Sequence, residues 1–273
     1  KEFFVRAENV FMSNDFQLVP ANSFEQVVNT IGVNALWASQ DVCLVVVNSK
    51  LYRLVGDTLI DLNYTVSPPL AFCMVDTFVY FCSYYGNGKL NKTTNTITAW
   101  GLPNPTPPVV ETVGGSLQEA TYLIAVTIQD HTGLESGSSN IVAVTGTGFT
   151  IKVLDTAYKH NIYVSSPNGK ELKLAGSLQP HETVFEFTSP ISSFGATLQT
   201  RGLLNPPYGN SLEFFMGRLF IGCYDILYFT EPFKFDCVAP TNFISFETQI
   251  KYLTATETNL FVATYDGLYS ISR

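Results

Sequence analysis

A short motif that recurs four times along the chain constrains its fold more than any other feature of the sequence. Each copy consists of an apolar segment, a tight polar turn and a second apolar segment, which opens with Leu-Tyr in three of the copies. The copies span residues 44–52, 77–90, 219–228 and 260–269, and the turn of the second is lengthened around Asn87-Gly88. Short runs rich in β-branched and aromatic residues, separated by turn residues, are typical of β-strands. The motif therefore predicts four β-hairpins.

The spacing of these hairpins indicates a larger repeat. The first two copies begin about 34 residues apart and the last two about 41, and two further strands are predicted inside each interval, at residues 58–64 and 69–74 and at residues 236–246 and 249–255. Hairpins that recur at roughly 40 residues with two strands between them are typical of the four-stranded blades of a β-propeller. Four blades do not close a comfortable ring. We therefore expect an incomplete propeller, closure by a strand from Phe3–Val19, or closure by residues outside this chain.

A different unit is predicted between the second and third hairpins. It begins at the proline-rich stretch Leu102–Pro108 and ends near Arg201–Tyr208, and both stretches are typical of domain boundaries. Seven short strands are expected inside it, at residues 109–113, 120–129, 141–145, 150–154, 161–165, 171–174 and 183–187. That pattern is typical of an immunoglobulin-like or fibronectin III-like sandwich. The predicted organisation is all-β: propeller-like residues 1–102, an inserted sandwich at residues 103–200, and propeller-like residues 201–273.

One short helix is also predicted. Ser23 is a suitable N-cap for residues Phe24–Asn34, where apolar side chains recur at helical spacing. Gly32 would end this helix early, so one or two turns are expected.

The composition excludes several classes of partner. Only 14% of the residues are charged, against about a quarter in an ordinary soluble domain, and the net charge is −8. Because Lys and Arg do not cluster anywhere, sequence-specific nucleic-acid binding is not expected. The longest apolar runs, such as Val42–Val47, are far shorter than the roughly 18 residues of a membrane helix, so no membrane insertion is expected.

The five cysteines are predicted to be free thiols of the core. Cys43, Cys73, Cys82, Cys223 and Cys237 lie in apolar strings such as VCLVVV and VYFCS. Their odd number and the lack of CxxC spacing argue against a disulfide framework and a structural zinc site. The pattern favours assembly in a reducing cytosol.

Residue patterns for catalysis are scarce. The three histidines have no metal-ligand spacing, and we interpret them as exposed turn residues: His131, His160 and His181. Ser136 lies between glycines at residues 133–137, but no strand-to-helix elbow of a serine hydrolase surrounds it. Four aspartates at turns or strand ends are the remaining candidates for a glycosidase or a calcium site: Asp57, Asp76, Asp225 and Asp266. Because Asp also favours tight turns, we predict no catalytic, cofactor-binding or metal-binding residue.

The inserted segment resembles a known module. The resemblance rests on the runs Gly115-Ser116-Leu117, Ala120-Thr121-Tyr122, Val126-Thr127, Asp130, Gly133, Glu135-Ser136, Ile162-Tyr163-Val164-Ser165 and Asn168-Gly169. In order and spacing these runs are similar to the fibronectin III-like module of tail proteins of tailed bacteriophages and prophages. The flanking residues resemble phage virion proteins as well, at Ala35-Leu36-Trp37, Trp100-Gly101 and residues 212–232. Glu119 departs from the pattern, because the family usually has a small residue there, and so does Ile226 in the third hairpin turn.

The resemblance implies a non-enzymatic structural component of a phage tail, of the ring, collar, nozzle or tail-hub type. Its expected partners are further copies of itself, in a ring-like homo-oligomer, and other tail or portal-proximal proteins. Its expected location is the tail of the virion, assembled in the cytoplasm of the bacterial host. Large permanent interfaces are depleted in charged residues, which agrees with the low charge.

Two alternatives remain open. The first is a host-receptor or carbohydrate-binding tail protein with weak glycan contacts, for which exposed Tyr84 and Tyr85 are the candidates in the aromatic run that includes Phe78, Tyr80 and Phe81. We favour a core role for most of that run. The second alternative is a glycosidase, for which Asp225 would be the residue to test.

Overall fold

The structure is a computed structural model that describes residues 10–12, 18–20, 26–39, 41–191 and 193–272. These residues contain twenty-four strands and no helix, so the described part of the chain is all-β. It therefore holds no helix with the length and hydropathy needed to cross a membrane.

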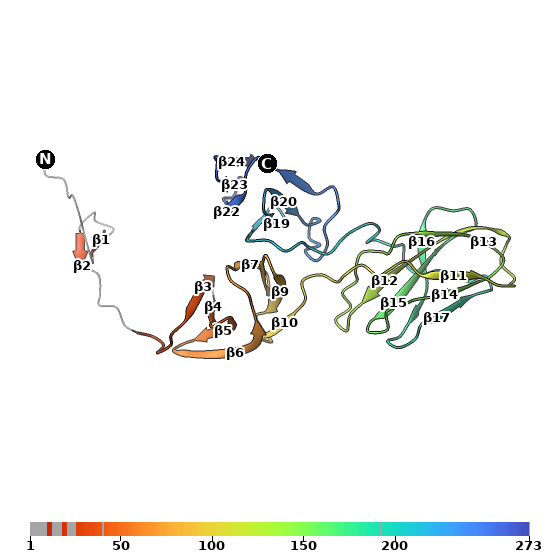
Figure 1. Cartoon of the computed structure of the whole chain (residues 1–273), viewed down its shortest axis with the longest axis horizontal. Helices are drawn as coiled ribbons and strands as arrows, with labels where there is room; N and C mark the ends of the chain where they lie inside the picture. The colour runs from red at the N-terminus through yellow and green to blue at the C-terminus, as the bar shows by residue number, and fades with distance from the viewer. Residues whose placement is uncertain (1–9, 13–17, 21–25, 40, 192, 273) are drawn as a thin grey trace.

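Fifteen strands form four antiparallel sheets in which each strand pairs with the next one along the chain (Figure 1). The first sheet consists of β3 (Val33–Ser39), β4 (Val42–Val47), β5 (Lys50–Val55) and β6 (Thr58–Thr65). The second consists of β7 (Ala71–Val75), β8 (Phe78–Ser83), β9 (Gly86–Asn91) and β10 (Thr96–Thr98). The third consists of β18 (Ser211–Phe215), β19 (Arg218–Cys223), β20 (Ile226–Phe229) and β21 (Phe243–Ser245). The fourth has three strands, β22 (Ile250–Ala255), β23 (Asn259–Thr264) and β24 (Leu268–Ser272).

The four predicted hairpins are confirmed. They are the pairs β4 and β5, β8 and β9, β19 and β20, and β23 and β24, each with an antiparallel register. Residues 236–246 form a shorter strand than predicted, because only Phe243–Ser245 pairs with β20. A further short pair, β1 (Val10–Met12) and β2 (Leu18–Pro20), overlaps the predicted closure segment Phe3–Val19, whose other residues are outside the described part of the chain.

Consecutive sheets pack face to face and share their cores. The first and second sheets bury Leu44 and Phe81 between them, the second and third bury Cys82 and Ile221, and the third and fourth bury Leu227 and Leu260. A sheet with apolar residues on both faces cannot bury them alone, so the stacking satisfies the hydrophobic pattern of the strands. The four sheets are arranged around a centre: their first strands, β3, β7, β18 and β22, all contribute to one hollow, and Figure 1 shows β3, β7 and β22 turned toward it.

Residues 109–187 form a separate two-sheet sandwich (Figure 1). One sheet has the order β11-β14-β17 and the other β13-β12-β15-β16. The strands are β11 (Val109–Thr112), β12 (Ala120–Gln129), β13 (Val142–Gly146), β14 (Phe149–Lys152), β15 (Lys159–Ser165), β16 (Leu172–Leu178) and β17 (Val184–Phe187). Both sheets contribute to one core that includes Ile124, Phe149 and Ile162. In an immunoglobulin constant-type domain the first and second strands share a sheet. Here they do not: β11 pairs with β14, and β12 belongs to the other sheet.

The two connections between the sandwich and the stacked sheets are held together by hydrogen bonds. The Nδ2 of Asn104 donates to the carbonyl oxygens of Ser138 (3.1 Å) and Leu203 (2.7 Å). The Nε1 of Trp100 donates to the carbonyl of Phe235 at 2.7 Å, and Trp100 is almost fully buried. The chain is therefore held directly before the proline-rich stretch, at Trp100, and within it, at Asn104.

The predicted helix at Phe24–Asn34 is wrong for the residues that the structure describes. Residues 26–32 are irregular, and Val33 and Asn34 belong to β3. The expected apolar face has no partner, since Val27 is 57% and Ile31 is 84% exposed. A helix of one or two turns is unstable without such packing.

Candidate functional site

The first strands of the four stacked sheets line an open cavity of about 410 Å³. Its walls come from Trp37 on β3, Phe72 on β7, Ser211 on β18 and Lys251 on β22, with Asn210 directly before β18. Each of these four strands is the first strand of its sheet. Because the first strands lie around the same cavity, residues that are far apart in the sequence come together there. This is the largest of the hollows described for this part of the chain, and its volume lies in the range of small-molecule sites.

Two residues of this wall each have a buried side-chain oxygen that has no hydrogen-bond partner. The two oxygens are the Oγ of Ser211 and the Oδ1 of Asn210. The Nδ2 of Asn210 makes only a long contact, at 3.5 Å, to the carbonyl of Ile250. Ser211 pairs with Gly222 of β19, and a side chain at Gly222 would collide with the Ser211 hydroxyl. Glycine at this position thus leaves room for the serine.

The aromatic part of the wall is a stacked pair. The rings of Trp37 and Phe72 lie 5.6 Å apart with an interplanar angle of 26°. Both residues also line a second hollow of about 330 Å³, which extends to Glu213. Burial raises the pKa of the Glu213 carboxyl, although its Oε1 accepts a hydrogen bond from the Phe214 amide at 3.0 Å. The two hollows therefore share one aromatic wall.

Lys251 is the one charged residue in the wall of the larger cavity. Its Nζ donates to the Oε1 of Gln249 at 3.2 Å and lies 3.7 Å from the ring centroid of Tyr265. No carboxylate among the described residues forms an ion pair with Lys251.

Three hairpin turns carry tyrosines at the same end of the sheets. Tyr84 follows β8, Tyr224 follows β19 and Tyr265 follows β23. The rings of Tyr84 and Tyr224 stack at 4.9 Å, and the Nε2 of Gln249 donates to the hydroxyl of Tyr84 at 2.5 Å. We call Tyr84, Tyr224 and Tyr265 the tyrosine strip. Gln249 and Lys251 connect it to the cavity.

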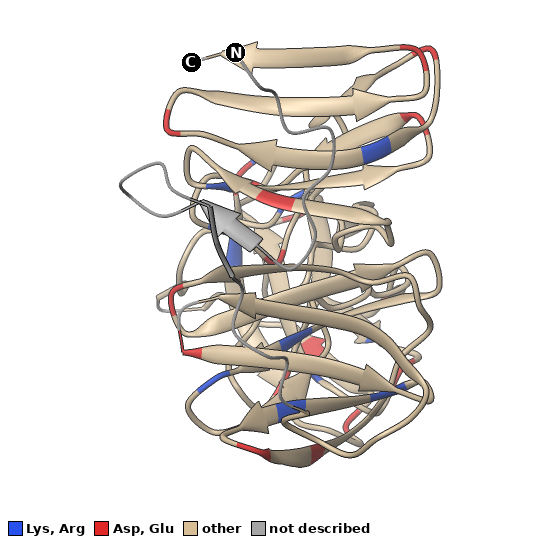
Figure 2. Cartoon of the chain, turned by 90° about the vertical axis from the view of Figure 1, so that its left-hand side faces the viewer, with Lys and Arg blue, Asp and Glu red and all other residues tan. Residues whose placement is uncertain are grey.

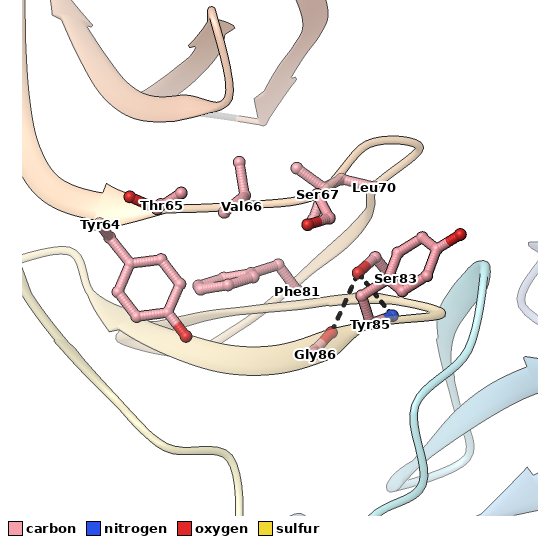
Figure 3. Close-up of a pocket in the computed structure, with 9 residues that line it drawn as sticks. All are labelled: Tyr64, Thr65, Val66, Ser67, Leu70, Phe81, Ser83, Tyr85 and Gly86. Carbon is pink, nitrogen blue, oxygen red and sulfur yellow. Dashed lines mark hydrogen bonds between the residues drawn. The ribbon is translucent and has the colours of Figure 1, made fainter.

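Tyr85 lies beside a smaller pocket of about 130 Å³ (Figure 3). Figure 3 shows Tyr64, Phe81 and Tyr85 around it, with the Tyr85 amide donating to the Oγ of Ser83. Tyr85 is 74% exposed, whereas Phe81 is almost fully buried, as expected for a core residue. Of the two tyrosines proposed from the sequence, only Tyr85 is therefore freely exposed; Tyr84 is half-buried against Tyr224.

The four candidate aspartates do not converge. Asp57, Asp76, Asp225 and Asp266 occupy the turns after β5, β7, β19 and β23. Asp266 accepts hydrogen bonds from Thr248, Thr264 and Tyr269, which lower the pKa of its carboxyl to about 2. Among the described residues, no group of three or more His, Cys, Asp or Glu side chains is arranged to hold a metal ion.

The histidines are not all turn residues. His131 and His181 are exposed in turns, as predicted, but His160 is buried in β15 and the prediction for it is wrong. Burial lowers the pKa of the His160 imidazole. The residue is the second of β15, and its alternation with Ile162 and Val164 is the sequence signal that indicated an inward position.

Ser136 and Glu135 support the sandwich. The Ser136 hydroxyl is buried, donates to the carbonyl of Gly137 at 2.7 Å and accepts from the Ile128 amide at 3.0 Å. The Oε1 of Glu135 accepts from Thr127, from Asn161 at 3.0 Å and from Tyr163 at 2.8 Å. The glycine-flanked serine is thus committed to backbone contacts.

The free cysteines occupy two environments. Cys73, Cys82 and Cys237 are buried, whereas Cys43 and Cys223 are only partly buried. Burial raises the pKa of the thiols of Cys73 and Cys82 to about 12 and that of Cys237 to about 11.

No protein-family model and no curated protein matches the chain. Solved structures give distant matches. BamB from Moraxella catarrhalis is 14% identical with a TM-score of 0.26, and the match covers 86% of this chain and 67% of BamB. The extracellular domain of a putative one-component system from B. thetaiotaomicron is 14% identical with a TM-score of 0.26, and the match covers 97% of this chain and 40% of that chain. The CNH domain of AfRom2 is 8% identical with a TM-score of 0.25, over 95% of this chain and 75% of that domain.

Proposed function

We propose that this chain is a non-enzymatic structural component of a phage tail, an open β-propeller of four blades that carries an inserted immunoglobulin or fibronectin III-like sandwich. In this role it joins further copies of itself and docks to other tail proteins. The proposal combines the resemblance of the sequence with one structural observation: within the part of the chain that the structure describes, no further sheet packs on the rear side of the first sheet or on the front of the fourth, and both sides carry few charges. The proposed location is the tail of the virion.

The three internal interfaces support this role because they are built alike. We call the side of a sheet that faces the next sheet its forward face, and the opposite side its rear face. In each interface a forward face packs on a rear face, with Leu44 against Phe81 in the first and Leu227 against Leu260 in the third. Two faces remain, the rear face of the first sheet and the forward face of the fourth.

Strand alternation and register identify the side chains on these open faces. The forward face of the fourth sheet carries Thr254, Phe261, Ala263 and Leu268, and Leu268 is 70% exposed. The described residues of this face include no charged side chain.

The rear face of the first sheet carries Leu36, Tyr52 and Leu54 together with Val45 and Val47 of the central strand; Leu36 is 69% exposed, whereas the two valines are buried. Its charged residues are Lys50 and Asp61, whose Nζ and Oδ2 lie 3.9 Å apart. Figure 2 views the molecule from the side of β3 and β22–β24 and shows charged residues scattered singly over strands and turns.

One open face is therefore a forward face and the other a rear face, which is the combination that packs together in all three internal interfaces. A forward face of one copy on the rear face of the next would make a head-to-tail interface, which gives a ring where the rotation closes. Exposed apolar faces of this kind mark protein interaction sites.

The experiment measures the mass of the purified protein over a range of concentrations by light scattering after size exclusion. We expect a defined oligomer, which Leu268→Lys and Leu36→Lys each disrupt, since a buried charge without a partner is costly. Leu154→Lys is the matched control, because Leu154 is 69% exposed but lies in the sandwich.

A mixture tests the head-to-tail arrangement directly. Leu36→Lys keeps an intact fourth-sheet face and Leu268→Lys keeps an intact first-sheet face, so the two variants together should form a heterodimer and nothing larger. A monomer at every concentration, alone and with tail proteins, would contradict the proposal. The phage origin is tested separately, by locating the chain in images of a particle that contains it.

A further inference from the structure

We propose that His160 makes one end of the sandwich sensitive to acid: this end is closed while the imidazole is neutral, and protonation of the buried ring opens it at residues 153–158. We call residues 153–158, after β14, and residues 179–183, after β16, the loop end of the sandwich. The inference goes beyond the proposed role in assembly, because it concerns the sandwich alone.

The imidazole of His160 is enclosed by apolar neighbours. The residue is only 1% exposed. In the register of its sheet it lies between Ile128 of β12 and Leu178 of β16, both of which are buried. It alternates with Ile162, which belongs to the core between the two sheets, so its ring is directed into the sandwich.

One nitrogen of this ring has no partner. The Nδ1 of His160 is buried and makes no hydrogen bond. In a neutral imidazole one nitrogen donates and the other accepts, whereas in the protonated ring both nitrogens donate. The closed form therefore suits a neutral ring that carries its hydrogen on Nε2. A proton on Nδ1 would place a charged donor in the core without an acceptor, which is costly.

The charges around His160 do not offset this cost. Among the described residues, Asp155, exposed in the loop after β14, is the charged residue whose field favours the protonated ring, and the carbonyl of Tyr158 favours it too. Burial outweighs both and lowers the pKa of the imidazole. The residues that β12 and β16 place beside the ring are apolar. Lys159 lies on the opposite face of β15, where its Nζ donates to the Oε1 of Gln129 at 2.9 Å.

The other titratable groups of this end of the sandwich lie in its turns. They are Asp130, His131, His181 and Glu182, and all except Asp130 are exposed. The Oδ1 of Asp130 accepts from the amides of Thr132 and Leu134 within its own turn. The exposed groups titrate in contact with water, so their protonation does not require the sandwich to open.

The loop of residues 153–158 is the part that can move. Residues 154–157 are exposed. Among the described residues, two backbone hydrogen bonds hold the loop to residues 181–183: the Val153 amide donates to the Thr183 carbonyl at 2.9 Å, and the His181 amide donates to the Thr156 carbonyl at 3.0 Å. The strand that carries His160 is paired on both sides. Because segments with few buried contacts open most easily, the loop moves and the strand stays.

The sign of the pH effect follows from the two forms. In the open form the ring is in water and takes up a proton near the ordinary pKa of histidine, about 6.5. The closed form binds this proton less readily, because burial lowers the pKa of His160. The closed form is therefore favoured at neutral pH, and this preference is lost as the pH falls below about 6.5.

The test measures hydrogen exchange of backbone amides in the full chain at pH 7.5 and pH 5.5. Results are expressed as protection factors, so that the intrinsic pH dependence of exchange cancels. We expect the protection of the Val153 and His181 amides to fall about threefold or more at the lower pH. The fall should not exceed about tenfold per pH unit, since a single proton is taken up. The amides of β4 and β8, in the stacked sheets, should keep their protection.

Substitution of each histidine assigns the effect. His160→Phe retains a ring that cannot be protonated and should remove the change, and His160→Leu should do the same if the larger ring does not fit. His131→Phe and His181→Asn are the controls and should retain it; asparagine suits the positive φ of residue 181. These are the three histidines of the chain, so every imidazole is covered. An unchanged pH response in both His160 variants would overturn the proposal.

Nitrogen-15 NMR of the imidazole rings tests the mechanism independently. At pH 7.5 we expect His160 to be the neutral tautomer with its hydrogen on Nε2. At lower pH it should take up a proton only together with the loss of protection at the loop end. If His160 is protonated while the Val153 and His181 amides keep their full protection, the closed sandwich accommodates the charge and the proposal is wrong.

Discussion

Lys89 on β9 and Asp236 after β20 form an ion pair that crosses the interface between the second and third sheets. The Lys89 Nζ lies 2.7 Å from the Asp236 Oδ1, and the two side chains are only 11% and 19% exposed. The Lys89 ammonium also lies 5.4 Å from the ring centroid of Phe78. Two sheets separated in sequence by the whole sandwich are thus connected by a nearly buried charge pair.

Breaking this pair should be costly. Lys89→Met leaves Asp236 buried without its partner, and we expect the free energy of unfolding to fall by about 3 kcal/mol. The double variant Lys89→Met/Asp236→Leu should recover most of this loss, because an apolar pair replaces the ionic one. Urea unfolding followed by fluorescence measures both. Lys152→Met, which removes an exposed ion pair with Glu111, should cost less than about 1 kcal/mol; equal losses in the two lysine variants would contradict the prediction.

The attachment of the sandwich depends on Gly137. A Cβ at this position would collide with the carbonyl of Leu203 and approach the Nδ2 of Asn104, the two groups that hold the connections together. We expect Gly137→Ala to displace them and to accelerate proteolysis near residues 102–108 and 201–208. Gly114→Ala, where a Cβ meets open space, is the control. Identical digestion of both variants would show that the contact does not restrain the connections.

Asp266 should titrate well below an ordinary carboxyl. Hydrogen bonds from the hydroxyls of Thr248, Thr264 and Tyr269 lower its pKa from 3.8 to about 2. They therefore stabilise the folded state above pH 4, and this contribution is lost as the pH falls from about 4 to 2. NMR titration of the carboxyl carbon should give the low pKa, and Thr264→Val should raise it. An unchanged pKa in that variant would rule out the Thr264 hydroxyl as a cause.

The thiols should divide into two classes. At pH 8 we expect Ellman's reagent to label Cys43 and Cys223 in the folded protein, because both are partly exposed. Cys73, Cys82 and Cys237 should react only after unfolding, since they are buried and their raised pKa values keep them protonated. Mass spectrometry of the labelled peptides identifies the sites. Rapid labelling of Cys82 in the folded state would contradict the packing of the second sheet on the third.

The sequence predicted elements where the signal is local. The hairpins were accessible because an apolar run, a turn and Leu-Tyr are contiguous, and the strand Ala120–Gln129 was predicted with its observed bounds. The helix at Phe24–Asn34 failed because helical spacing says nothing about whether a partner surface exists. The strand order of the sandwich was also inaccessible, since β11 pairs with β14 across the intervening β12 and β13.

The cavity could not be predicted for a similar reason. Trp37, Phe72, Ser211 and Lys251 each precede or begin a hairpin in ordinary strand positions, and only the arrangement of the four sheets brings them together. The four aspartates, in contrast, were conspicuous in the sequence because they sit at turns, and turns at different places keep them apart.

The bond from Trp100 to Phe235, which joins residues 135 positions apart, has a consequence for how the chain acquires its fold. Closing so long a loop in an unstructured chain is slow, because its conformational entropy must be lost before the contacts form. The sandwich has its own core and its two connections meet at Asn104. Once the sandwich has folded, its two connections hold the second and third sheets close together, as a short loop between them would. We therefore expect the sandwich to fold first and its folding to set the rate at which the sheets assemble.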